Sequence, residues 1–395
     1  MTNTTVRAVN RLTMRWAEQA ATGEEGTVVM ATGVWPLLAF LAGGADGPAR
    51  AELAEALGTS ADSAVETARD LLDALADVRG LRAATGLWTR ADLPLADPWL
   101  ASLPHGARGT LTGDEDTDRK TLDGWAQQRT DGLVEEMPVS LQQDTRLVLA
   151  SALALRLRWA EPFAERSLRP DHGPWHGRIL RGLSRTTSEL DPVRVTHGPA
   201  GPVTALEVRG ADGLDVHLLL GEPQVSAGEV LAAGLAVVTG AAPAVGAGSL
   251  PEGRPAPGLT VRTVDAYAPE PVLHVDTVAF SVRAEHDLLE HASLFGLESA
   301  SDPTSGHFPG ISPEPLAVGS ARQSAMAAFD ATGFEAAAVT AIAAQPGGGP
   351  PPRPGHRVRR VEVSFHRPFG FLAVHRTSRL VLAAGWVADP VTLTA

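Results

Sequence analysis

The sequence contains no cysteine, and Lys120 is its single lysine among 395 residues. Without cysteine the chain can form no disulfide, no thiolate metal site and no thiol nucleophile. The formal net charge of −13 argues against nucleic acid and against anionic membrane surfaces as partners. The hydrophobic content of 44% is enough for a large core, and alanine, glycine, proline and arginine are abundant, as in proteins from GC-rich bacterial genomes.

The common signatures of enzymes are also missing. There is no G-x-S-x-G elbow, no phosphate-binding Walker loop, no G-x-G-x-x-G after a strand and no H-E-x-x-H pair. The nearest histidine cluster contains His286 and His291, whose spacing of five points them to different helix faces. We therefore expect no enzyme activity, no cofactor and no metal site, although a conventional hydrolase stays a minor alternative.

Long apolar runs are few. Residues 28–45 carry no charge, but they contain Gly33 and Pro36 and barely reach the length of a membrane span. They predict a buried core helix. The first residues show no apolar run after their charges, so no signal peptide is expected and the chain is predicted to be cytoplasmic.

Periodicity predicts a mixed arrangement of helices and strands. Helical spacing is seen in segments 6–20, 48–57, 63–78 and 117–136, with a short helix at 287–295. Apolar or alternating runs predict strands at 83–89, 145–159, 206–220, 272–282, 358–365, 368–374 and 380–387.

One stretch, residues 333–355, combines two incompatible halves. Its first half, through Gln345, is small, apolar and competent to form a strand, with Glu335 as its one charge. Its second half carries five prolines and four glycines, which exclude a helix or a central strand. Only about 40 residues follow, too few for a stable separate domain without cysteine or metal. We therefore predict a single domain, residues 1–395, with a long exposed loop at about 333–360.

Several motifs, in order along nearly the whole chain, resemble those of the serpin family. The segments that carry the resemblance are 28–57, 122–132, 144–163 with Trp159, 308–316, the GFEAAAVT stretch at 333–340, PFGF at 368–371 and GWVADP at 385–390. The chain is identified from them as a bacterial member of the serpins.

The resemblance implies a mixed α/β (α+β) serpin fold. It would have a large central, mostly antiparallel sheet that accepts one more strand, further sheets and about nine helices. It also implies a suicide inhibitor of a serine protease: the protease cleaves the loop, and the hinge half of the loop then inserts into the sheet. The hinge would comprise Gly333, Phe334, Glu335, Ala336, Ala337, Ala338, Val339 and Thr340. We expect a monomer whose partner is the target protease, and the resemblance also allows an extracellular location.

The chain departs from the family pattern in three places. Phe334 is bulkier than the usual hinge residue, and Gln323 and Ser151 replace the histidine and asparagine expected where the sheet opens, near Trp159. A polar network there would be rewired or absent. These departures keep open a non-inhibitory binding or carrier protein, whose loop is cleaved without trapping the protease.

The scissile bond has two candidates. Counting forward from the hinge predicts Gly347–Gly348, whereas counting back from Pro368 predicts Arg357–Val358. The first offers no side chain to a specificity pocket, and the second suits a trypsin-like protease. The pair Arg359–Arg360 would likewise suit a protease that cleaves at basic residues, and the alternative for these three arginines is an ordinary solvated loop.

Overall fold

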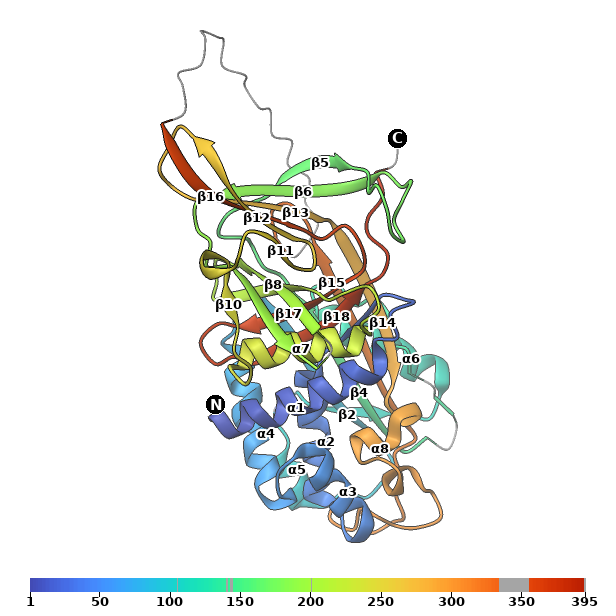
Figure 1. Cartoon of the computed structure of the whole chain (residues 1–395). Coiled ribbons are helices and arrows are strands. Elements are labelled where there is room, and N and C mark those ends of the chain that lie inside the picture. The colour runs from blue at the N-terminus through green and yellow to red at the C-terminus, as the bar shows by residue number, and fades with distance from the viewer. Residues whose placement is uncertain (105, 140, 143–144, 200, 334–354, 394–395) are drawn as a thin grey trace.

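A computed structural model describes residues 1–104, 106–139, 141–142, 145–199, 201–333 and 355–393. These residues form eight α-helices and eighteen strands in three sheets (Figure 1). The resemblance predicted about nine helices, one more than the described ranges contain. The helices are α1 (Asn3–Ala20), α2 (Ala31–Gly44), α3 (Gly47–Leu57), α4 (Ala61–Ala76), α5 (Asp97–Ser102), α6 (Glu115–Arg129), α7 (Ala227–Thr239) and α8 (Ala292–Phe295).

Helix α2 lies inside the molecule because it is apolar on every side. All of its residues except Gly43 are buried, including Pro36 within the helix. The prediction of a core helix from the uncharged run is confirmed. Among the described residues no helix is both long and apolar enough to cross a membrane.

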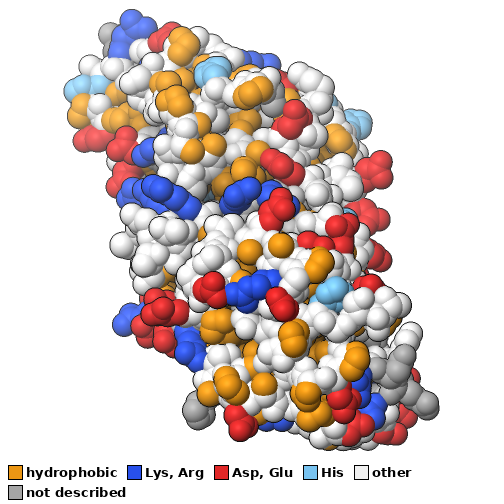
Figure 2. Space-filling model, turned by 90° about the horizontal axis from the view of Figure 1, so that it is seen from below, with side chains coloured by type: hydrophobic (Ala, Val, Ile, Leu, Met, Phe, Trp, Pro, Cys, Tyr) orange, Lys and Arg blue, Asp and Glu red, His pale blue; other side chains and the backbone are white. Residues whose placement is uncertain are grey.

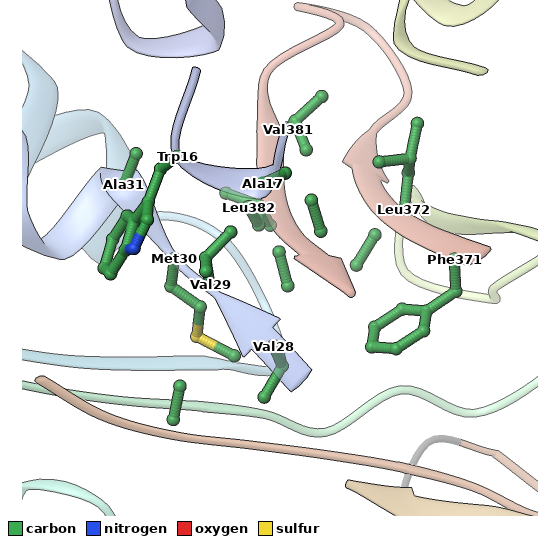
Figure 3. Close-up of a cluster of buried hydrophobic side chains, with 14 of the residues drawn as sticks. Trp16, Ala17, Val28, Val29, Met30, Ala31, Phe371, Leu372, Val381 and Leu382 are labelled. Carbon is green, nitrogen blue, oxygen red and sulfur yellow. The ribbon is translucent and has the colours of Figure 1, made fainter. Parts of the chain in front are cut away.

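The seven-stranded sheet is antiparallel throughout. Its order is β1 (Thr27–Val29), β18 (Val381–Val387), β17 (Phe369–His375), β9 (Leu214–Leu220), β8 (Gly201–Arg209), β7 (Val193–Gly198) and β10 (Val245–Gly246). The two apolar runs near the C-terminus pair with each other as β17 and β18, as expected. Their side chains meet those of α1 and β1 in one cluster, part of which includes Trp16, Val29 and Leu372 (Figure 3).

The five-stranded sheet is mixed. Its order is β14 (Phe280–Asp287), β15 (Ser320–Phe329), β4 (Leu147–Leu155), β2 (Leu81–Arg90) and β3 (Arg108–Leu111). Strands β15 and β4 pair in parallel, as do β2 and β3, and the other two pairings are antiparallel. Antiparallel pairing thus predominates in the fold, but the middle of this sheet holds a parallel pair.

Helix α6 and the chain after it cover one face of this sheet. Leu122 and Ala126 of α6 pack with Met137 and Val139 against Val148 and the alanines of β4. The helix ends at Arg129, because Asp131 and Gly132 adopt left-handed backbone conformations.

The six-stranded sheet lies at the end of the molecule opposite helices α3 to α5 (Figure 1). Its order is β11 (Gly253–Ala256), β12 (Leu259–Ala266), β16 (His356–Ser364), β13 (Val272–Val278), β6 (Leu180–Thr187) and β5 (Ala164–Leu168). One continuous hydrophobic core extends from Val6 to Val387, and the single domain of residues 1–395 stays a prediction.

Both signs of charge are interspersed on the face that Figure 2 shows. Several of the described carboxylates and arginines are paired on the surface, for example Arg146 with Glu314 at 2.5 Å. Exposed pairs of this kind contribute little to stability.

Candidate reactive-loop hinge and sheet seam

The parallel pair β15–β4 forms a seam through the five-stranded sheet. Seven residue pairs lie in register along it, from Ser320 opposite Val148 to Met326 opposite Ala154. A strand that entered this seam in the direction opposite to β15 would be antiparallel to both neighbours. Parallel pairing is slightly less stable per residue than antiparallel pairing, so one weaker ladder would be replaced by two stronger ones.

The chain reverses direction directly above the seam. After β15, the Asp330 carboxylate accepts hydrogen bonds from Thr332 N at 2.7 Å and Gly333 N at 2.9 Å. The Asp330 N–H donates in turn to Gly333 O at 2.8 Å. An aspartate that caps the following backbone in this way closes a tight turn. The turn aims the chain back toward the sheet.

Trp159 holds this turn from the β4 side. Its indole Nε1 donates to Asp330 O at 2.9 Å, and its backbone N–H donates to Thr332 O at 3.0 Å. Its ring packs on Phe329, with centroids 4.6 Å apart, and Phe329 stacks on Phe280 at 5.3 Å. The aromatic group fixes the top of β15 against the segment that follows β4.

Gly333, which the sequence predicts to be the first hinge residue, runs antiparallel to the segment that follows β4. It forms an antiparallel bridge with Arg158, which lies three residues beyond the end of β4 at Leu155. A Cβ on Gly333 would lie 1.9 Å from Leu157 O, so only glycine fits here.

The middle of the seam contains a buried polar link. Gln323 lies opposite Ser151 in the register, and both are fully buried. Gln323 Nε2 donates to Met30 O at 2.9 Å and to Ser151 Oγ at 3.4 Å, while Gln323 Oε1 accepts from Met30 N at 3.0 Å. One side chain thus ties β15 to β4 and to the residue before α2. The network is present, but it is built differently from the family pattern.

The first turn of helix α2 packs tightly against β4 at the seam. A Cβ on Gly33 would lie 2.2 Å from Ser151 Oγ and 2.2 Å from Leu153 Cδ1. Any separation of β15 from β4 therefore changes contacts along the first turn of α2.

The remaining hinge residues, Phe334 to Thr340, and the candidate bond Gly347–Gly348 lie outside the described residues. The alternative bond Arg357–Val358 is placed in β16, where the two residues pair with Asp265 and Val264 of β12. The loop predicted to reach about residue 360 therefore ends at Gly355, because a strand partner is available from His356 onward.

Two features of the site were not predicted from the sequence. The turn at Asp330 has a signal that could have revealed it, an aspartate followed closely by threonine and glycine. The partner strand β12 has no such signal, since its contact with β16 joins segments about 100 residues apart.

The comparisons with known proteins decide the family. A model of the family described as serpin (serine protease inhibitor) matches residues 7–176 and 272–390, well over half of the chain. The chain is a serpin. Serpin-Z6A of Oryza sativa subsp. japonica is 26% identical over 408 residues, covering 96% of this chain and 99% of that protein.

Solved serpin structures share the fold along the whole chain. The thermophilic serpin tengpin in its native state matches with a TM-score of 0.75 and 14% identity, covering 98% of this serpin and 95% of that chain. Thyroxine-binding globulin in complex with thyroxine matches with a TM-score of 0.70 and 15% identity, covering 98% and 99%. At these identities the likeness shows the fold alone, and proteins of this family are generally inhibitors rather than enzymes.

Proposed function

We propose that this serpin is a suicide inhibitor of serine proteases that works by loop insertion. The observation that carries the proposal is the position of Gly333, turned back and bridged to Arg158 above the parallel seam. The target protease would attack a bond in the loop, with Gly347–Gly348 as the proposed site, and form its acyl-enzyme. The freed hinge half would then enter between β15 and β4 as an antiparallel strand and carry the protease with it.

The energetics favour this direction. Each net backbone hydrogen bond stabilises by about 0.5–1.5 kcal/mol, and an inserted strand gains ladders on both edges. Before cleavage the loop cannot insert fully without releasing its far end, because β16 pairs with β12 from His356 onward and also with β13 from Arg360 onward. Cleavage removes this restraint, so the chain is held in a less stable state until a protease cuts it.

The proposal is tested by incubating the serpin with porcine elastase, subtilisin and trypsin, followed by SDS-PAGE and intact mass measurement. We expect a covalent band at the sum of 41.2 kDa and the protease mass with at least one of them. The mass of the released C-terminal fragment identifies the cleaved bond. Clean cleavage without this band, and without a rise in thermal stability, would contradict inhibition.

A groove between α1 and α7 favours a second candidate, a carrier. Its volume is about 720 Å³, and Val6, Met14 and Leu235 line it, with Arg7 and Arg379 also present. It would suit an apolar molecule that carries an acidic group. Thyroxine, the ligand bound in the structure of thyroxine-binding globulin, is a suitable probe. Saturable binding of thyroxine, combined with loop cleavage that traps no protease, would favour the carrier.

A further inference from the structure

Strand β16, the first element after the loop, is held differently along its length. Strand β12 pairs with eight consecutive residues, from His356 to Val363, whereas β13 pairs only from Arg360 onward. Within the described chain, residues 356–359 are therefore tied into the sheet by β12 alone. Strand β12 therefore fixes the position at which the exposed loop ends and β16 begins.

The hairpin that contains β12 lies outside the residues that the family model matches. Strands β11 and β12 belong to segment 177–271, between the two matched parts. Its turn at Gly258 is fixed to the far end of β16, where Ser364 N donates to Gly258 O at 2.9 Å. The hairpin therefore covers what would otherwise be an edge of β16.

The side chains of two arginines in β16, Arg359 and Arg360, are also engaged. Arg359 Nε donates to Ala247 O at 3.0 Å, and its Nη2 donates to Leu250 O. Arg360 Nε donates to the carboxylate of Glu362 at 2.8 Å. A trypsin-like protease needs such an arginine side chain free for its specificity pocket, and it needs the backbone extended and unpaired. Neither condition is met at Arg359 and Arg360, whereas the exposed Arg357 is withheld by the pairing of its backbone with Asp265.

The loop itself offers no other basic bond to such a protease. Between residues 333 and 355 the one basic residue is Arg353, and Pro354 follows it. Trypsin-like proteases cleave poorly before proline. Along the chain, the next basic bonds after the loop are those within β16.

We propose that the β11–β12 hairpin withholds the basic bonds at Arg357, Arg359 and Arg360 from trypsin-like proteases. The target would then be a protease that accepts small or apolar residues. The shielding itself does not depend on the inhibitory mechanism, whereas the choice of target class rests on the proposed function. The hairpin acts through backbone pairing, so its residues determine specificity without contacting the protease.

The first test uses the native protein. Trypsin and subtilisin are applied in parallel, and intact mass identifies each cleaved bond over time. We expect subtilisin to cleave within 334–355 while the bonds after Arg357, Arg359 and Arg360 stay intact in trypsin. Trypsin cleavage after any of these arginines at a rate comparable to loop cleavage by subtilisin would overturn the proposal. This readout is independent of whether a covalent complex forms.

The second test assigns the protection to β12. Val264 and Asp265 face Val358 and Arg357, and successive N–H groups of a strand point to opposite edges. Proline at one of the two positions removes a backbone hydrogen bond from β12 to β16. Proline at the other position removes an N–H that points to the opposite edge of β12, where no described strand pairs with these two residues. We expect one of V264P and D265P to raise trypsin cleavage after Arg357 by about tenfold or more, since proteolysis follows the open population.

The other proline variant is the matched control and should stay resistant, with both variants retaining the thermal midpoint of the parent within a few degrees. Resistance of both variants after Arg357 would show that β12 is not the shield. A loss of protection that matched a general fall in the midpoint would likewise overturn the assignment to β12. Subtilisin cleavage of the loop should be the same in all three proteins.

Discussion

At the scale of single residues, the start of the hinge is determined by the absence of a side chain. Gly333 approaches Leu157 O so closely that no Cβ can be accommodated without movement of backbone. The turn that brings it there depends on the Asp330 carboxylate and on the Trp159 indole. In the proposed mechanism, this turn would be the starting point of insertion.

We predict that Gly333→Ala will displace the turn and weaken trapping. Relief of the clash requires a backbone shift, which we expect to cost about 1–3 kcal/mol in the free energy of unfolding. More of the loop should then be cleaved as substrate, measured as the ratio of covalent complex to cleaved serpin. Gly355→Ala is the control, since no atom lies within 4 Å of the added Cβ. Equal ratios in the two variants would contradict the role given to Gly333.

At the scale of elements, one glutamine forms hydrogen bonds in the middle of the seam. Gln323 joins β15 to β4 and also satisfies Met30, which is fully buried. The link to Ser151 at 3.4 Å is long for a hydrogen bond, whereas the two to Met30 are short. The glutamine therefore anchors β15 to Met30, the residue before α2, more strongly than to β4.

This difference gives a pair of substitutions with unequal effects. Gln323→Leu leaves Met30 N buried without a partner and should cost about 1–3 kcal/mol of stability. Ser151→Ala removes only the long bond and should cost less than about 1 kcal/mol. Urea unfolding of both variants measures the difference. A larger loss for Ser151→Ala would show that the link across the seam dominates.

The elements with strong local patterns were predictable. The uncharged run became α2, and the apolar runs near the C-terminus became β17 and β18. Two predicted strands were wrong in extent, because each is two strands. Residues 206–220 fall in β8 and β9, which a turn ending at Gly213 separates, and residues 272–282 fall in β13 and β14, which belong to different sheets.

The rest depended on contacts that no local pattern reports. Strand β12 is polar on one face, and its pairing with β16 is visible only in three dimensions. Because of this pairing, the candidate bond Arg357–Val358 lies in a strand and not in the predicted loop. The hinge from Gly333 to Thr340 stays a prediction, and the capping by Asp330 and the bond from Gln323 to Met30 could not be predicted from the sequence.

At the scale of the whole molecule, buried histidines link stability to pH. Burial lowers the pKa of His217, His286, His366 and His375 below the ordinary value of 6.5. His217 is the most buried of the four, with 6% of its surface exposed, and it lies near Arg379. The Nε2 atom of His286 forms a hydrogen bond with Val28 O at 2.9 Å. Each of these groups takes up its proton at a lower pH in the folded protein than in the unfolded chain, where the pKa is near 6.5.

The sign of the effect follows from proton binding. Between the lowered folded pKa values and 6.5 the unfolded state binds more protons, so stability rises with pH across this window and falls as the pH drops below 6.5. Each unit by which a pKa is lowered corresponds to about 1.4 kcal/mol. We therefore expect the urea concentration at the midpoint of unfolding to decrease when the pH is lowered from 7 to 5.5, a range above that in which the carboxylates titrate. The double variant H217Q/H286Q should show a flatter dependence than the parent, and an unchanged slope would exclude these two histidines as the cause.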